Sequence, residues 1–200
     1  SGILKLPAGH LLRFRDGAHE VKRWFSFKEG TLFQSKEEAR NKIRDIALDA
    51  VRLQLVSDRP LGVFLSGGID SSAIVGLTRE LNQGPLKTFS VGYEGNHVKE
   101  KFNDDVELAR KTAQHFGTDH YEIRISGSQV ADSFEKIIEA MDEPLGSHIQ
   151  PSTFFLAEFA KQEITVALGG DGVDELFGGY GRYWLSNRID QLRRVPGLIH

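Results

Sequence analysis

The sequence predicts an α/β fold in which helices cover both faces of a parallel, doubly wound sheet. Between residues 61 and 169, short apolar runs alternate with longer stretches whose apolar side chains recur at helical spacing. Strands separated by helices of about 10–15 residues imply parallel pairing with right-handed crossovers. Two glycine-rich segments directly follow apolar runs, as ligand loops do in such sheets. The composition, 40% hydrophobic and 26% charged, is that of a chain that can bury a core.

The first 34 residues have strand and turn character and form a short N-terminal β segment. Short apolar runs flank two turn signals, Pro7–His10 and Asp16-Gly17, and an Asp-Gly pair is typical of a two-residue hairpin. We expect three or four short strands here, which bury too little to be stable alone. They are either a decoration of the main domain or the tail of a separate β-rich domain.

The alternating helices and strands begin after this segment. Ser35 and Glu38 have the spacing of a capping box, so a helix is expected from Ser35 to about Asp58-Arg59-Pro60. Apolar runs and breakers then place strands at 61–66, 86–93, 119–125 and 164–169, and helices at 69–82, 103–117, 128–141 and 152–162.

Three segments with glycine, hydroxyl or acidic side chains lie at the ends of these strands. They are Ser66–Ser72, Ser90–Tyr93 and Gly169–Tyr180. In parallel α/β sheets, ligands bind beyond the carboxyl ends of the strands, where the strand order reverses. We therefore expect the three segments to converge on one ligand.

The first of these segments has the features of a phosphate-binding loop. It reads Ser-Gly-Gly-Ile-Asp-Ser-Ser between an apolar strand and a helix. Backbone N–H groups and the positive end of the helix then point at one place, which suits a phosphate. A tight turn with a hydroxyl cap is the simpler alternative, but the whole string favours phosphate. Asp70 would repel a phosphate unless a cation lies between them, and Mg²⁺ (magnesium) prefers one or two carboxylates with phosphate oxygens.

The segment Gly169–Tyr180 contains five glycines among twelve positions, together with Asp171, Asp174 and Glu175. Glycines allow the backbone to approach a ligand closely. A flexible acidic surface loop is the alternative interpretation. The position directly after an apolar strand favours a ligand-binding loop instead.

Charge and composition restrict the classes of partner. The net charge of −3 gives no reason to expect a nucleic-acid or anionic membrane partner. These 200 residues contain no cysteine, which excludes disulfides, thiolate metal sites and a cysteine nucleophile within them. We find no signal peptide and no apolar run of about 18 residues, so the expected location is cytoplasmic.

The loop at Ser66–Ser72 resembles the SGGxDS pyrophosphate loop (PP-loop) of the N-type ATP pyrophosphatases. Together with Gly169–Tyr180, it is similar to the synthetase domain of the asparagine synthase (glutamine-hydrolysing) family. The resemblance extends to weaker motifs at Asn103–Arg110, Gly117–His120, Asp142-Glu143-Pro144 and Pro7–His10. It implies an adenine nucleotide α-hydrolase-like (Rossmann-like) fold.

The same resemblance implies a domain organisation. Residues 1–34 would be the C-terminal end of a glutaminase-type domain plus linker, and residues 35–200 an ATP-pyrophosphatase domain truncated at its C-terminus. Such a fragment would lack the N-terminal cysteine nucleophile of the family and the C-terminal stretch that carries a further catalytic lysine.

Residue roles follow from the family motifs. The β and γ phosphates of ATP would be held by Ser66, Gly67, Gly68, Asp70, Ser71 and Ser72. The adenosine would be held by backbone around Leu65, Val91, Gly169 and Gly170. Asp70 and Asp174 would hold Mg²⁺ and, with Asp171, form the catalytic set; many family members carry glutamate at the position of Asp171. Tyr180 and Arg182 would line the side of the acid substrate.

The resemblance implies adenylation of a carboxylate, with the aspartate side chain as the expected acceptor, and release of pyrophosphate. Ammonia, derived from glutamine, would then give asparagine and AMP. Within 142–150, Gly146-Ser147-His148 replaces a frequent acidic residue, which leaves the acceptor acid open. Three other functions remain open: a ring-closing β-lactam or peptide synthetase, another amidotransferase, and an inactive nucleotide-binding relative. The protein could also form a homodimer.

Overall fold

The computed structural model describes residues 2–28, 30, 33–95, 101–141, 147 and 149–193. The chain divides into two compact units, Ser1–Ile43 and Arg44–His200. Among the described residues, no helix combines the length and the apolar character needed to cross a membrane.

The first unit contains one antiparallel hairpin of β1 (His10–Arg15) and β2 (Ala18–Arg23). The hairpin turn at Asp16-Gly17 is the predicted one, since both residues have positive φ, 52° and 78°, as a type I′ turn requires. The expectation of three or four strands was wrong for the described part of this segment. Residues 3–6 lie outside any strand because no second strand pairs with them.

Helix α1 (Lys36–Gln54) follows, and it ends four residues before the predicted stop at Asp58. Its start uses the expected residues, because Ser35 Oγ accepts a hydrogen bond from the N–H of Glu38 at 3.1 Å. The Glu38 carboxylate accepts from the N–H of Gln34 at 2.9 Å. Apolar side chains at helical spacing along α1 are largely exposed, with Ile46 at 58% and Leu53 at 59%.

The second unit is built on a four-stranded parallel sheet, which confirms the predicted fold class. The strands are β3 (Leu61–Phe64), β4 (Lys87–Tyr93), β5 (Asp119–Ile125) and β6 (Val166–Leu168). Their order is β5-β4-β3-β6. The chain therefore adds strands on one side of β3 and then returns to its other side. The strand order reverses between β3 and β6, and this is the point where ligands bind in such sheets.

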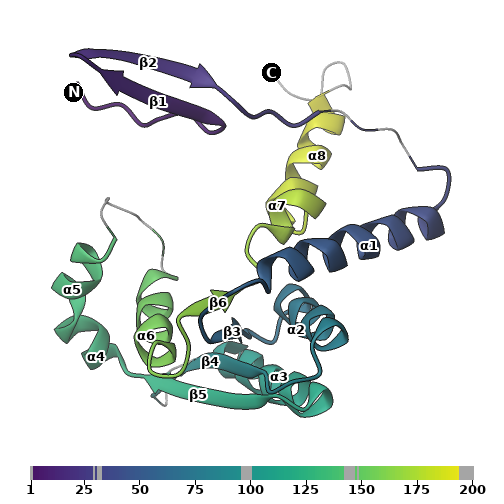
Figure 1. Cartoon of the computed structure of the whole chain (residues 1–200), viewed down its shortest axis with the longest axis vertical. Coiled ribbons are helices and arrows are strands. Elements are labelled where there is room, and N and C mark those ends of the chain that lie inside the picture. Colours follow the sequence, from purple (N-terminus) through teal and green to yellow (C-terminus); the bar gives the residue numbers. More distant parts are fainter. Residues whose placement is uncertain are drawn as a thin grey trace. The chain divides into compact units, whose positions relative to one another are not determined.

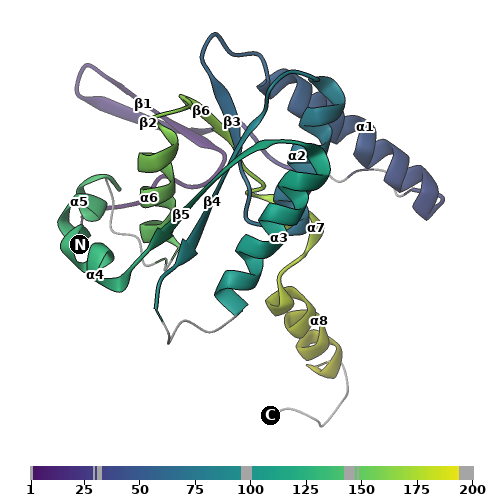
Figure 2. The same ribbon diagram turned by 90° about the horizontal axis from the view of Figure 1, so that it is seen from below.

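Helices pack on both faces of this sheet (Figures 1 and 2). Helices α2 (Ile69–Leu81) and α3 (Lys101–Phe116) cover one face, and α6 (Gln150–Ala160) covers the other. Because successive strand residues point to opposite faces, the sheet contributes to two cores. The core under α2 and α3 contains Val63, Leu65, Val75, Leu86, Ala109, Ala113 and Leu168. The core under α6 contains Phe89, Leu156, Ala160 and Ile164.

The predicted helix over 128–141 is two short helices, α4 (Gly127–Asp132) and α5 (Phe134–Glu139). Ser126 and Gln129 form a complete capping box at the start of α4. The break falls at Ser133, whose φ of −101° and ψ of 7° leave the helical region. Asp and Ser compete with helical backbone bonding through their own side chains, so an Asp132-Ser133 pair favours such a break.

Two further differences lie close to the predicted site. Helix α3 begins at Lys101, before the cap predicted at Asn103 or Asp104. The side chain of Asn103 instead accepts a hydrogen bond from the N–H of Tyr93 at 3.4 Å, which ties α3 to β4. Helix α7 (Val173–Phe177) forms inside the segment expected as a loop, and α8 (Gly181–Arg193) follows it.

Candidate active site

The loop between β3 and α2 lies against α3 so closely that one of its positions requires glycine. Gly67 has a φ of +82°, which L side chains rarely adopt. A Cβ on Gly67 would lie 2.2 Å from the carbonyl oxygen of Asp105 and 2.8 Å from the backbone nitrogen of Ala109. The Gly-Gly pair therefore brings the loop backbone against α3 as well as forming a turn.

Hydroxyl groups hold this loop in shape. Ser71 Oγ accepts from the N–H of Ser66 at 3.2 Å, lies 2.9 Å from Ser66 Oγ, and donates to the carbonyl oxygen of Gly68 at 3.2 Å. Ser71 is buried, whereas Ser66 is exposed. Ser72 Oγ lies 3.3 Å from Thr112 Oγ1 of α3. Ser71 thus shapes the loop, and its predicted contact with phosphate stays a prediction.

The amino end of α2 supplies donors for an anion. Its N-cap is Gly68, which offers no side chain to cap the first N–H groups. The first N–H groups of a helix lack intrahelical partners and carry partial positive charge, so they favour an anion. The half-buried Asp70 lies in the first turn of this 13-residue helix. The carboxylate of Asp70 is therefore adjacent to the helix end for which the sequence predicts an anion, and the anion itself stays a prediction.

The loop after β6 touches the loop after β3. A Cβ on Gly170 would lie 2.8 Å from the backbone nitrogen of Ser71 and 2.9 Å from the Cβ of Asp70. The parallel register that pairs Val63 with Leu168 directs both loops out of the same edge of the sheet. Two motifs about a hundred positions apart are thus brought into contact at the switch point.

The acids of the second motif are placed by neighbouring glycines. Asp171 is exposed, and its Oδ2 would lie 2.7 Å from a Cβ on Gly169. Asp174 is half-buried in the first turn of α7, and its Oδ1 would lie 1.9 Å from a Cβ on Gly179. No side chain at position 179 could coexist with this carboxylate orientation.

Within the described ranges, no group of three or more His, Cys, Asp or Glu side chains could by itself hold a metal ion. Asp70 and Asp174 are two carboxylates of a kind that suits Mg²⁺, which completes its shell with phosphate oxygens and water. The donor chemistry of these two side chains therefore fits Mg²⁺, and their joint role as ligands stays a prediction.

Tyr180, Arg182 and Glu175 form a cluster at the start of α8. The Tyr180 hydroxyl donates to Glu175 Oε1 at 2.7 Å, and the guanidinium of Arg182 lies 4.2 Å from the centre of the Tyr180 ring. This hydrogen bond raises the pKa of Tyr180 and lowers the pKa of Glu175. The structure brings Tyr180 and Arg182 together, and their predicted contact with the acid substrate stays a prediction. The bond between Tyr180 and Glu175 was not foreseen from the sequence, because a spacing of five residues is not a regular helical contact.

Val91 lies where β4 extends beyond β3. The pairing between these strands ends at Phe64 and Phe89, followed by a 2.8 Å hydrogen bond from the N–H of Leu65 to the carbonyl oxygen of Phe89. Beyond it, β4 pairs only with β5, as far as Tyr93 opposite Ile125. We call residues 90–93 the β4 overhang. In the described pairing, Val91 has no strand opposite it on the β3-facing side, whereas the N–H of Tyr93 donates to the side chain of Asn103.

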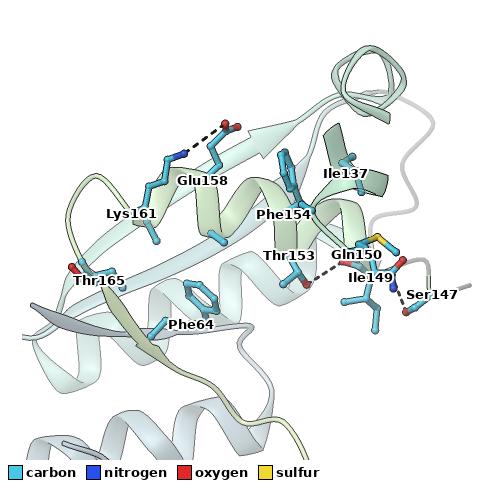
Figure 3. A pocket seen from close by; sticks show the side chains of 16 residues that line it. Phe64, Ile137, Ser147, Ile149, Gln150, Thr153, Phe154, Glu158, Lys161 and Thr165 are labelled. Carbon is cyan, nitrogen blue, oxygen red and sulfur yellow. Dashed lines mark hydrogen bonds and ion pairs between the residues drawn. The ribbon is translucent and has the colours of Figure 1, made fainter. Parts of the chain in front are cut away.

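A separate cavity of about 790 Å³ lies on the α6 face of the sheet (Figure 3). Phe64, Thr153, Phe154 and Lys161 are among its lining residues. None of the described residues that line it is a predicted site residue. Ser147 also lines it, whereas Gly146, His148 and the motif Asp142-Glu143-Pro144 lie outside the described residues.

Fold and site together define a class: a doubly wound α/β domain in which the Ser66–Ser72 loop and the acidic glycine-rich loop meet at the switch point. The family model described as asparagine synthase matches residues 42–198. The chain belongs to the asparagine synthase family, which confirms the resemblance inferred from the two glycine-rich motifs.

Individual relatives agree with this assignment. The chain is 36% identical over 195 residues to asparagine synthetase [glutamine-hydrolyzing] 1 of Bacillus subtilis, and this match covers 97% of the chain and 30% of that protein. It is 31% identical over 198 residues to a putative asparagine synthetase [glutamine-hydrolyzing] 2 of Methanocaldococcus jannaschii, and this match covers 98% of the chain and 37% of that protein. The chain thus spans about a third of the length of these curated relatives.

Among solved structures, an NH3-dependent NAD synthetase from Campylobacter jejuni matches with a TM-score of 0.46 and 17% identity. The match covers 70% of this chain and 60% of the NAD synthetase chain.

Proposed function

We propose that this chain is the ATP-cleaving part of a carbon–nitrogen ligase that adenylates a carboxylate and then forms an amide. The observation that carries the proposal is the contact of Gly170 with Asp70 and Ser71. It joins an anion-binding helix end to the second acidic motif. Membership of the asparagine synthase family supports the same assignment.

The pyrophosphate end of ATP would lie on the Ser66–Ser72 loop. Backbone N–H groups at the start of α2 would offset the charge that develops on the departing pyrophosphate. Mg²⁺, held by Asp70 and Asp174, would neutralise phosphate charge when bound. The exposed Ser66 hydroxyl would donate to a phosphate oxygen, whereas Ser71 and Ser72 would act mainly by holding the loop.

The adenosine would lie along the β4 overhang, close to the backbone of Leu65 and Val91. Backbone groups that have no neighbouring strand need another partner. An adenine edge offers both a hydrogen-bond donor and acceptors, so it can satisfy such groups. Gly169 and Gly170 would face the same nucleotide from the loop after β6, where a larger side chain at position 170 would meet Asp70.

The chemistry would then need little from the side chains beyond positioning. A carboxylate oxygen of the acceptor attacks the α phosphorus, the bond between the α phosphorus and the bridging oxygen breaks, and pyrophosphate leaves. Ammonia attacks the resulting acyl carbon, loses a proton, and AMP departs. Arg182 and Tyr180 would hold the acceptor acid, with aspartate as the proposed acceptor and Asp171 close to the reacting groups.

The proposal extends to the protein that carries this chain. Residues 1–34 would be the end of a glutaminase domain that supplies ammonia from glutamine, and residues 35–200 the ATP-pyrophosphatase domain. The activity would lie in the cytoplasm, where ATP and free amino acids are available.

A second candidate is an amide-forming enzyme with another acceptor. One observation favours a different activity: a relative of this chain has another name. The chain is 30% identical over 218 residues to a Gibberella zeae protein named Amidase chry2, and the match covers 99% of this chain and 32% of that protein. The family relationship therefore does not by itself fix the acceptor acid.

The test measures AMP and pyrophosphate formed from ATP by the gene product that carries this chain, with a panel of amino acids and with glutamine or ammonia. Aspartate should give the fastest turnover. Asp70→Asn should abolish pyrophosphate release, whereas the matched change Asp132→Asn, at an exposed aspartate in α4, should not. Unchanged release by Asp70→Asn would refute the role of Asp70, and a faster acid would replace aspartate as the acceptor.

A further inference from the structure

A buried polar cluster lies between α3 and the strands β4 and β5, outside the residues that the proposed chemistry uses. His120 lies at its centre. His120 Nδ1 is 2.9 Å from Thr88 Oγ1, and His120 Nε2 is 3.1 Å from Ser90 Oγ. Thr88 Oγ1 also lies 2.8 Å from Thr118 Oγ1. Thr88 and Ser90 are 0% and 2% exposed, whereas His120 and Thr118 are half-buried.

The imidazole spans two positions of the same strand. Thr88 and Ser90 are on β4 with one residue between them, and His120 lies opposite Thr88 on β5. Thr88 is inside the part of β4 that pairs with β3, whereas Ser90 is the first residue of the β4 overhang. The ring therefore joins the fully paired part of β4 to the part that has lost one neighbour.

Contacts with α3 also restrain the overhang, and its whole length pairs with β5. Asn103 bonds to the N–H of Tyr93, and a Cβ on Gly92 would lie 3.0 Å from a methyl of Val106. Both contacts act on the far end of the overhang. Ser90, which precedes Val91, is held on this side by His120.

The charges around His120 balance one another. Glu122 on β5 and Arg110 on α3 form a bidentate ion pair, with both contacts at 2.8 Å, and Arg110 also contacts Glu107 at 3.0 Å. Burial lowers the pKa of His120, while Glu122 raises it and Arg110 lowers it. A neutral imidazole offers one donor and one acceptor, and hydroxyl partners can match either tautomer.

We propose that His120 is a positioning residue for adenosine binding, because its bond to Ser90 fixes the backbone of the β4 overhang at Val91. This inference rests on the proposed function, since it assumes that the nucleotide lies along the overhang. His120 acts through Ser90 and touches no substrate. The loop Ser66–Ser72 does not depend on this bond.

The test separates the two ends of the nucleotide by measuring dissociation constants for AMP and for Mg²⁺–pyrophosphate by calorimetry. His120→Phe keeps a ring but removes both hydrogen bonds, and it should weaken AMP binding by about tenfold. Pyrophosphate binding should change by less than about twofold. Ser90→Ala removes the bond between Ser90 and His120 by deleting only the serine hydroxyl, and it should weaken AMP binding by the same factor.

Two conservative variants distinguish positioning from simple packing. The amide of His120→Gln reaches about as far as Nε2 and can bond to Ser90, so it should restore most of the AMP affinity. The amide of His120→Asn reaches only as far as Nδ1 and should not. Thr118→Val breaks a bond of the same cluster without touching Ser90, and AMP affinity should stay within about twofold of the unaltered chain.

Several results would overturn the inference. Equal losses of AMP and pyrophosphate affinity in His120→Phe and Ser90→Ala would indicate general damage to the fold. Unchanged AMP affinity in Ser90→Ala would show that the bond positions nothing. If the unaltered protein binds neither AMP nor pyrophosphate, the proposed function itself fails. The His120 variants alone cannot give that result.

Discussion

Gly170→Ala tests the contact between the two glycine-rich motifs most directly. The added methyl would lie 2.8 Å from the backbone nitrogen of Ser71, and 2.9 Å and 3.0 Å from the Cβ and carbonyl carbon of Asp70. Atoms this close must separate by about half an ångström or more, and two of the three belong to the backbone. The φ of Gly170 is not positive, so the effect would come from the contact alone.

Overpacking of this kind costs about 1–3 kcal/mol. We expect the free energy of unfolding to fall by that amount if the loops keep their positions. If they move apart instead, the same energy appears as weaker binding of Mg²⁺–ATP, by about 5-fold to 150-fold. Urea unfolding measures the loss of unfolding free energy, and calorimetry on the same samples measures the loss of binding free energy. The prediction is that the two losses add up to about 1–3 kcal/mol.

Gly127→Ala is the matched control, because a Cβ on Gly127 at the start of α4 meets no atom within 4 Å. It should leave both the unfolding free energy and ATP affinity within about 0.5 kcal/mol of the unaltered chain. A Gly170→Ala variant as stable and as tightly binding as this control would refute the contact, and with it the main support for a shared site.

Three other predictions concern single residues. Gly67→Ala should destabilise the chain by more than Gly170→Ala in urea unfolding, because it adds a left-handed φ to a 2.2 Å backbone contact; equal losses would contradict this. Arg79→Ala removes side-chain bonds to the carbonyl oxygens of Phe116 and Gly117 at the end of α3 and of Gly84 after α2. It should lower the unfolding free energy by about 1–3 kcal/mol without changing ATP affinity, and a loss of affinity alone would contradict that reasoning. Because the pKa of His120 is lowered in the folded chain, the unfolded chain binds the extra proton first. Stability should therefore decrease as pH falls below about 6.5, and His120→Gln should reduce that slope in unfolding curves between pH 7.5 and 5.

Local signals predicted much of the fold. Asp16-Gly17 forms the expected hairpin turn, and β5 covers the predicted range 119–125. These elements depend on neighbours in sequence, so a pattern in one chain suffices. The break at Ser133 and the early start of α3 were missed, since a helix boundary is a balance of small terms. Asn103 shows this balance, because it bonds to Tyr93 instead of capping the helix.

The site was predictable in its parts and less so in its assembly. Strand ends predicted where Ser66–Ser72 and Gly169–Tyr180 would lie, but their contact depends on β6 lying beside β3, which no periodicity reveals. The use of the Ser71 hydroxyl within its own loop was also hidden, because a serine can bond to a ligand or to the backbone with equal ease. The roles given to Asp171 and Asp174 remain predictions for experiment.

The contact between positions 70 and 170 has a consequence for synthesis of the protein. One side of the site leaves the ribosome about a hundred residues before the other, which at about 5–20 residues per second is roughly 5–20 s. During that interval β3 has no neighbour on its outer edge, and the early loop has nothing to hold it closed. The proposed nucleotide site is thus complete only late in synthesis, when β6 docks. A translation pause placed after residue 170 would give that docking time to finish.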